Sequence, residues 1–79
     1  MSDNRSNPTN KMKLHEAIEF VLQNMPNRTG NIEEITSKII HLDLYKQKDG
    51  SWPFPKQIWL RAKNYNQFEM LDNVTIRLI

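Results

Sequence analysis

The sequence predicts a small α+β domain in which three helices are followed by a short C-terminal β-hairpin. Apolar residues recur at helical spacing in two stretches after residue 11, and a proline-rich segment introduces a third helical stretch. At the C-terminal end, apolar and polar residues alternate, as they do in strands. With 79 residues and no cysteine, one modest hydrophobic core must stabilise the domain.

The first ten residues, MSDNRSNPTN, are polar and have no apolar periodicity. They are predicted to form a disordered tail before a domain that spans residues 11–79. No apolar run approaches the roughly 18 residues that a membrane span needs, and the N-terminus lacks the apolar region of a signal peptide. These features predict a soluble, cytoplasmic protein with no membrane partner.

The first helix is predicted within residues 11–25 because apolar residues there alternate in steps of three and one. They are Leu14, Ala17, Ile18, Val21, Leu22 and Met25. Pro26 is expected to end the helix, since proline cannot continue the hydrogen-bond ladder. The following residues, NRTG, are expected to form a turn or a very short strand.

A second helix of about ten residues is predicted to begin after Asn31. Asn31 is a favoured capping residue, and Glu34 stands three positions later, which is the spacing of a capping box. The buried face of this helix is predicted to carry four apolar residues: Ile32, Ile35, Ile39 and Leu42.

The third helix is predicted to begin at Pro55, where the missing N–H of proline costs nothing. The preceding Asp49-Gly50 pair is a hairpin signal, but Pro53 and Pro55 would interrupt a returning strand, so a connecting loop is expected. One narrow face of the helix is predicted to be buried, through Ile58, Ala62 and Tyr65. The opposite face carries Lys56, Leu60 and Lys63.

The C-terminal residues predict a β-hairpin. Apolar residues at Phe68, Met70, Val74, Ile76 and Leu78 alternate with polar ones on either side of the turn LDN. Three helices followed by a hairpin is the plan of a winged helix-turn-helix domain.

Residues dispersed over 12–79 resemble the HARE-HTH-like winged-helix family. The first two helices match its patterns through Glu16-Ala17-Ile18, Val21-Leu22, Glu34-Ile35 and Ile39. The C-terminal block matches through Asp49-Gly50, Pro53 or Pro55, Gln57-Ile58, Arg61, Tyr65 and Phe68. The resemblance implies a DNA-binding or nucleoprotein-associated module of the kind attached to enzymes or transcription proteins, and hence a role in transcription regulation. This chain departs from the family in its short final turn and in the apolar residues Phe54 and Trp59.

Charge is unevenly distributed, although the formal net charge is only +2. Residues 14–44 contain five acidic and two basic residues, whereas residues 45–65 contain five basic and one acidic residue. The basic half coincides with the third helix and the loop before it, which fits equally a polyanion-facing surface and a solvated surface without a partner. Together with the winged-helix plan it makes duplex DNA the predicted ligand, with the third helix entering the major groove.

The predicted DNA-binding residues are polar or basic side chains of the third helix, its loop and the last strand, together with one leucine: Lys46, Lys48, Lys56, Gln57, Leu60, Lys63, Asn64 and Arg77. Lysines suit phosphates, amide side chains suit adenine edges, and a leucine suits a thymine methyl group. Two alternatives stay open: the loop lysines are solubilising charges, and Arg77 pairs with Glu69 across the hairpin. The Arg61 side chain is expected to pack along the third helix and fix the loop.

The alternative function is a protein–protein adaptor, possible as part of a larger nucleoprotein complex. Trp59 and Leu60 would then form an apolar patch for a protein partner. At least one of Trp52 and Phe54 is expected to fold over the edge of the core instead.

No catalytic residue, metal ligand or cofactor is predicted, and the chain is not expected to be an enzyme. The stretch HEAIE, His15 to Glu19, lacks the second histidine of the zinc-protease motif. His41 lies on another segment, and two glycines are too few for a glycine-rich phosphate loop.

Overall fold

The computed structural model describes residues 12–79, so the predicted tail over residues 1–10 lies outside the described residues. The chain forms α1 (Leu14–Gln23), the short 3-10 helix η2 (Pro26–Arg28), β1 (Thr29–Asn31), α2 (Ile32–His41), α3 (Pro55–Ala62), β2 (Phe68–Met70) and β3 (Thr75–Leu78). Three α-helices and a three-stranded antiparallel sheet confirm the predicted α+β class.

The sheet has the order β1-β3-β2, so the last strand in the sequence is the central one. β2 and β3 form the predicted hairpin, in which Glu69 lies opposite Arg77. β1 adds a third strand on the other side of β3, with Gly30 opposite Ile76. The segment that the sequence assigns to a turn or a very short strand therefore contains both, as η2 and β1.

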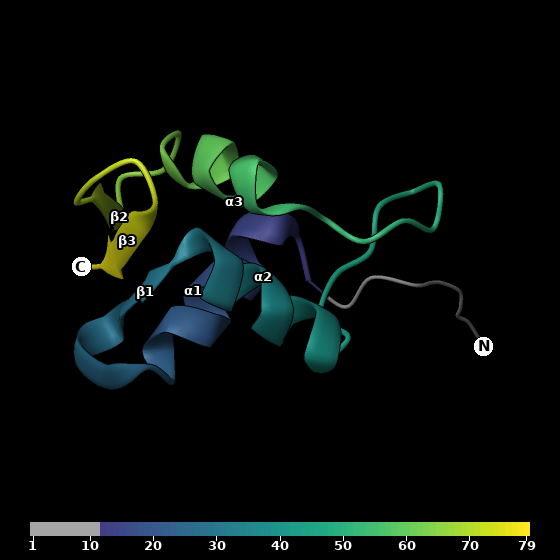
Figure 1. Cartoon of the computed structure of the whole chain (residues 1–79), viewed down its shortest axis with the longest axis horizontal. Helices are drawn as coiled ribbons and strands as arrows, with labels where there is room; N and C mark the ends of the chain where they lie inside the picture. Colours follow the sequence, from purple (N-terminus) through teal and green to yellow (C-terminus); the bar gives the residue numbers. More distant parts are fainter. Residues whose placement is uncertain (1–11) are drawn as a thin grey trace.

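The core lies between the three helices and the inner face of the sheet. Figure 1 shows the sheet at one end of the molecule and the loop between α2 and α3, residues 42–54, extending at the other. The buried apolar side chains of the core come from every α-helix and from β2 and β3: Leu14, Ala17, Ile18, Val21, Leu22, Ile32, Ile35, Ile39, Ile58, Ala62, Phe68, Ile76 and Leu78. Within residues 12–79, no helix combines the length and the apolar character needed to cross a membrane.

The predicted helix starts are confirmed for α2 and α3. The backbone N–H of Glu34 donates to Asn31 Oδ1 at 2.8 Å, and the N–H of Asn31 donates to Glu34 Oε1 at 3.2 Å. This reciprocal pair satisfies donors that a helix N-terminus leaves without intrahelical partners. Pro55 is the first residue of α3, and no strand forms between it and the Asp49-Gly50 turn.

Three residues predicted for helical buried faces lie beyond the helix ends. Leu42 is 50% exposed because α2 ends at His41 and the backbone turns at Asp43, which has a positive φ of 54°. Tyr65 follows the end of α3 and is half-buried against the ring of His15 rather than within a helical stripe. Met25 follows α1 and is partly buried against the core. In each case the apolar periodicity predicts a longer helix than the one that forms, because a turn ends the helix before this residue.

Replacing Ile58 with alanine should destabilise the domain strongly. Ile58 has no exposed surface, and truncating a buried isoleucine of this kind costs about 2–5 kcal/mol of unfolding free energy. Urea unfolding followed by circular dichroism measures the change. Leu60→Ala, in the same helix but 41% exposed, is the matched control and should change stability by at most about 0.5 kcal/mol. Equal effects of the two substitutions would show that α3 packs by another face.

Candidate nucleic-acid interface

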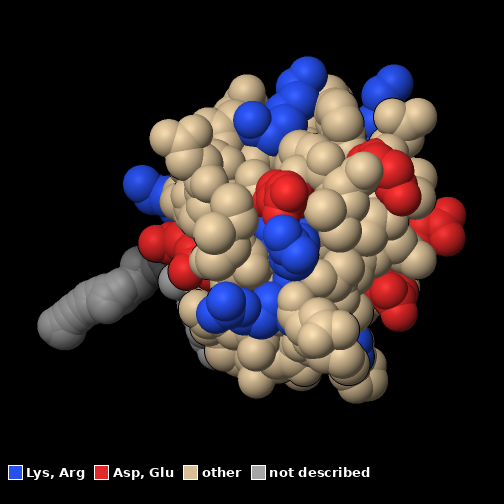
Figure 2. Space-filling model, turned by 90° about the vertical axis from the view of Figure 1, so that its left-hand side faces the viewer, with Lys and Arg blue, Asp and Glu red and all other residues tan. Residues whose placement is uncertain are grey.

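The face of α3 that points away from the core is basic. Ile58 and Ala62 are fully buried, whereas the side chains that we call the outer face are exposed: Lys56, Leu60, Lys63 and Asn64. Figure 2 shows Lys and Arg side chains along the top edge of the molecule, at the height that α3 occupies in Figure 1. The sequence from Gly50 to Phe68 contains no acidic residue, so no carboxylate within this segment offsets these charges.

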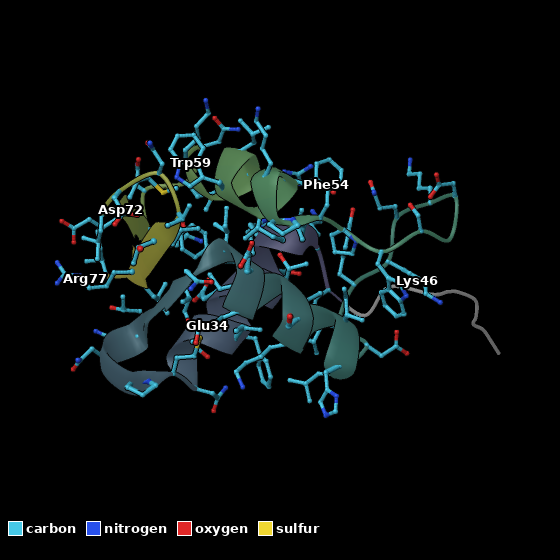
Figure 3. The ribbon with its side chains drawn as sticks, viewed as in Figure 1. Glu34, Lys46, Phe54, Trp59, Asp72 and Arg77 are labelled. Carbon is cyan, nitrogen blue, oxygen red and sulfur yellow. The ribbon has the colours of Figure 1, made fainter. Side chains whose placement is uncertain are left out.

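Trp59 attaches α3 to the hairpin. Its side chain is half-buried against the core, and its Nε1 donates to the backbone oxygen of Asp72 at 3.2 Å. Figure 3 shows Trp59 on α3 near the turn that contains Asp72. The ammonium group of Lys63 lies 5.2 Å from the centroid of the indole ring, within cation–π range. The predicted apolar pair is therefore unequal, because Leu60 is exposed while Trp59 serves the packing of α3.

Asp72 organises the turn that receives Trp59. Its Oδ1 accepts hydrogen bonds from the N–H groups of Val74 at 2.9 Å and Thr75 at 2.8 Å. These bonds, first that from Val74, lower the pKa of the Asp72 carboxyl below its ordinary value. The carboxylate therefore fixes the backbone whose carbonyl oxygen accepts the indole N–H, and so positions the start of β3 relative to α3.

Gln57, a predicted adenine reader, lies off the outer face. The residue is half-buried, and its Nε2 donates to Gln47 Oε1 at 3.1 Å. Its Oε1 is buried and has no hydrogen-bond partner. Gln57 thus connects α3 to the loop over residues 42–54 and has no open path to a base edge.

The two predicted loop lysines differ in exposure. Lys48 is exposed, whereas Lys46 is half-buried with its Nζ 4.5 Å from the centroid of the Trp52 ring. Between them and α3, Ser51 donates to Asp49 Oδ1 through its hydroxyl at 2.6 Å and its N–H at 3.0 Å. These two bonds lower the pKa of the Asp49 carboxyl and hold the turn at Gly50, whose φ of 89° favours glycine.

Phe54 and Trp52 are both exposed, at 54% and 38%. The expectation that at least one of them folds over the core edge is therefore wrong: Phe54 is the N-cap residue of α3, and the Trp52 ring lies beside the ammonium group of Lys46. Arg77 forms an ion pair with Glu69 across the hairpin. This pairing is one of the two alternatives predicted for Arg77, the other being a contact with DNA. This pairing leaves Arg77 less suited to a phosphate contact than the lysines of α3.

Sequence reasoning missed two hollows that residues from distant segments create. A small one of about 340 Å³ is lined by Ile32, Lys56, Trp59 and Asn73, where α2, α3 and the hairpin turn meet. A larger one lies beside the stacked rings of His15 and Tyr65, fifty positions apart in the sequence. No local sequence signal identifies either, because each depends on how the elements pack.

Comparison of the chain with protein-family models, curated proteins and solved structures finds no significant match.

The stabilisation that Asp72 provides should depend on pH in a defined direction. Because the pKa is lowered in the folded state, the contribution is complete above the unfolded value of about 3.9. It should decline as the pH falls below that value and vanish below the folded-state pKa. The measurement is the difference in thermal midpoint between the wild type and Asp72→Ala from pH 7 to pH 2.

Asp72→Asn is the matched control, since its amide oxygen accepts the same hydrogen bonds but does not titrate. The difference in midpoint between Asp72→Asn and Asp72→Ala should therefore stay constant over this pH range. A wild-type difference that is equally constant would contradict a stabilising role of the Asp72 charge.

Proposed function

We propose that this chain is a winged helix-turn-helix module that binds duplex DNA through the outer face of α3. The order helix, strand, helix, helix, strand, strand, with a sheet ordered β1-β3-β2, supports this plan. The resemblance to HARE-HTH-like domains supports it from the sequence. In such modules the second helix of the helix-turn-helix pair enters the major groove, and here α3 is that helix.

The observation that carries the proposal is the exposure of Lys56 on α3 and of Lys63 at its C-cap, in a segment free of acidic residues. Phosphate contacts by lysine supply most of the affinity of a non-specific DNA complex through the release of counterions. Both side chains extend from the surface opposite Ile58, so DNA binding requires no rearrangement of the core.

The remaining exposed residues of the outer face suit base contacts. Asn64 uses its Nδ2 in a 3.2 Å hydrogen bond to the backbone oxygen of Leu60, which restrains its side chain and leaves Oδ1 as an acceptor. An acceptor of this kind pairs with the exocyclic amine of adenine or cytosine. Leu60, 41% exposed, suits a thymine methyl group.

The connection between α2 and α3, residues 42–54, is much longer than the three or four residues of a simple helix-turn-helix turn. It brings Lys46 and the exposed Lys48 to the end of the molecule beyond the start of α3. Within the proposed complex, Lys48 adds a phosphate contact beside the groove, and the cation–π contact with Trp52 holds Lys46 close to the loop backbone.

Changing Lys56 and Lys63 together to glutamine should weaken duplex binding and reduce its salt dependence. Each lost phosphate contact lowers the magnitude of the slope of log K against log salt by about 0.9, so the pair should lower it by about 1.8. Fluorescence anisotropy at several salt concentrations measures both quantities. The ligand is a dumbbell duplex, which has no strand ends that other surfaces of the protein would bind.

The control is the double substitution Lys13→Gln and Lys38→Gln, which makes the same change of charge at exposed positions on the α1 and α2 side. It should leave the slope within about 0.3 of the wild-type value if only α3 contacts DNA, since a single contact is worth about 0.9. Equal losses in both double variants would mean that net charge, not α3, attracts the duplex. Absence of salt-dependent binding by the wild type would reject the proposal.

The second candidate is a protein–protein adaptor, which the hollow beside Trp59 favours. This hollow is lined by the apolar side chains of Ile32 and Trp59 together with Lys56 and Asn73. It would accept an apolar side chain of a partner that carries an acidic residue nearby. If the wild type binds no duplex at low salt, the adaptor function takes precedence, and Asn73→Trp, which fills the hollow from an exposed turn, should abolish capture of the partner.

A further inference from the structure

The larger hollow, of about 500 Å³, lies on a different side of α3 from the outer face. Three segments meet there: the start of α1, the loop over residues 42–54, and the end of α3 with the turn that follows it. No residue of the outer face lines it. The pocket is therefore separate from the outer face of α3, although Lys48 of the loop is shared with the proposed duplex contact.

The pocket contains three aromatic rings. His15 and Tyr65 stack with their centroids 4.1 Å apart and their planes inclined by 16°, and Tyr45 lines the pocket from the loop. The Nδ1 of His15 is buried and has no hydrogen-bond partner. Buried polar atoms in proteins are normally paired, and an unpaired nitrogen beside a concave aromatic surface is a feature expected of a ligand site.

Three cationic side chains line the same pocket: Lys13 before α1, Lys48 of the loop and Arg61 of α3. Within residues 12–79, none of the three forms an ion pair with a carboxylate. Glu16 is the one acidic residue in the lining, and its Oε1 accepts the N–H of Lys13 at 2.8 Å as part of the α1 cap. The lining therefore combines flat aromatic surface with a net positive charge.

We propose that this pocket binds a nucleoside 5′-phosphate. Aromatic rings provide a stacking surface for a base of any identity, and Arg61 with Lys48 supplies donors for the phosphate oxygens. The same chemistry is offered by a free mononucleotide and by the terminal 5′-phosphorylated nucleotide of a DNA or RNA strand. An adenosine phosphate has the size for a pocket of this volume, which lies within the range of small-ligand sites.

The test is a titration of the ¹⁵N-labelled full chain with AMP, followed by backbone amide shifts. Shifts should change at residues 13–16, 45–48 and 61–65 and should saturate. Adenosine alone and inorganic phosphate alone should each bind at least about tenfold more weakly, since each lacks one set of contacts. A response to inorganic phosphate equal to that to AMP would overturn the proposal, as would no saturable response at millimolar AMP.

Arg61→Gln should weaken AMP binding about tenfold, the loss expected for one charge-assisted hydrogen bond. Lys48→Gln, in an exposed loop, is a second variant that tests the phosphate contact even if Arg61→Gln does not fold. Lys56→Gln, which removes the same charge from the outer face of α3, should leave AMP affinity unchanged. Equal losses in all three variants would reduce the effect to general electrostatics and overturn the proposal.

A 5′-phosphorylated trinucleotide distinguishes the two sources of the ligand, a strand end and a free nucleotide. Its binding is compared with that of the 5′-hydroxyl trinucleotide and of AMP, in the Lys56→Gln, Lys63→Gln background. Preference for the phosphorylated form over AMP assigns the pocket to strand ends, and equal affinity assigns it to free nucleotides. Binding that ignores the 5′-phosphate contradicts both assignments.

Discussion

The arrangement of this domain depends on how a short helix with a narrow apolar face is held in place. α3 buries only Ile58 and Ala62 completely, and eight residues of helix are too few to be stable without tertiary support. The hydrogen bond from Trp59 to the backbone of Asp72 adds a second attachment, to the hairpin turn that the Asp72 carboxylate organises. α3 is therefore fixed by the core on one side and by the hairpin on another, and the exposed side chains of its outer face do not pack in the core.

Because few residues of α3 are needed to hold it in place, its other positions can carry basic side chains. α1 and α2 pack through wide apolar stripes and carry four of the nine acidic residues, whereas α3 is anchored by few residues and displays Lys56, with Lys63 at its C-cap. A charged face of this kind costs little stability, because Lys56 and Lys63 keep their ammonium groups in water or beside an indole ring. The fold thus presents these lysines at its surface without placing an unpaired charge in the core.

Local patterns predicted much of the fold, because the physical signals are local. The Asn31–Glu34 cap, Pro55 at the start of α3 and the Asp49-Gly50 turn each involve residues within a few positions of one another. The prediction was wrong for Leu42, because a local turn ends α2 before it, and incomplete for Trp59 and Gln57, whose hydrogen-bond partners lie 13 and 10 positions away in other elements. Helical periodicity identifies which side of α3 faces inward. The contacts of the residues at the edge of this buried face depend on the loop or turn that packs beside them.

The same distinction separates the two proposed binding surfaces. The outer face of α3 is readable from the sequence because its residues lie on one helix or at its C-terminal end, so spacing alone places Lys56 and Lys63 on the same side. The pocket at His15 and Tyr65 is assembled from three segments, and each of them contributes a cation. Surfaces built on one helix suit a long, repetitive ligand such as a duplex, whereas a concave site with converging groups suits a compact one. On the two proposals, the duplex would lie on one side of α3 and a single phosphorylated nucleotide on another.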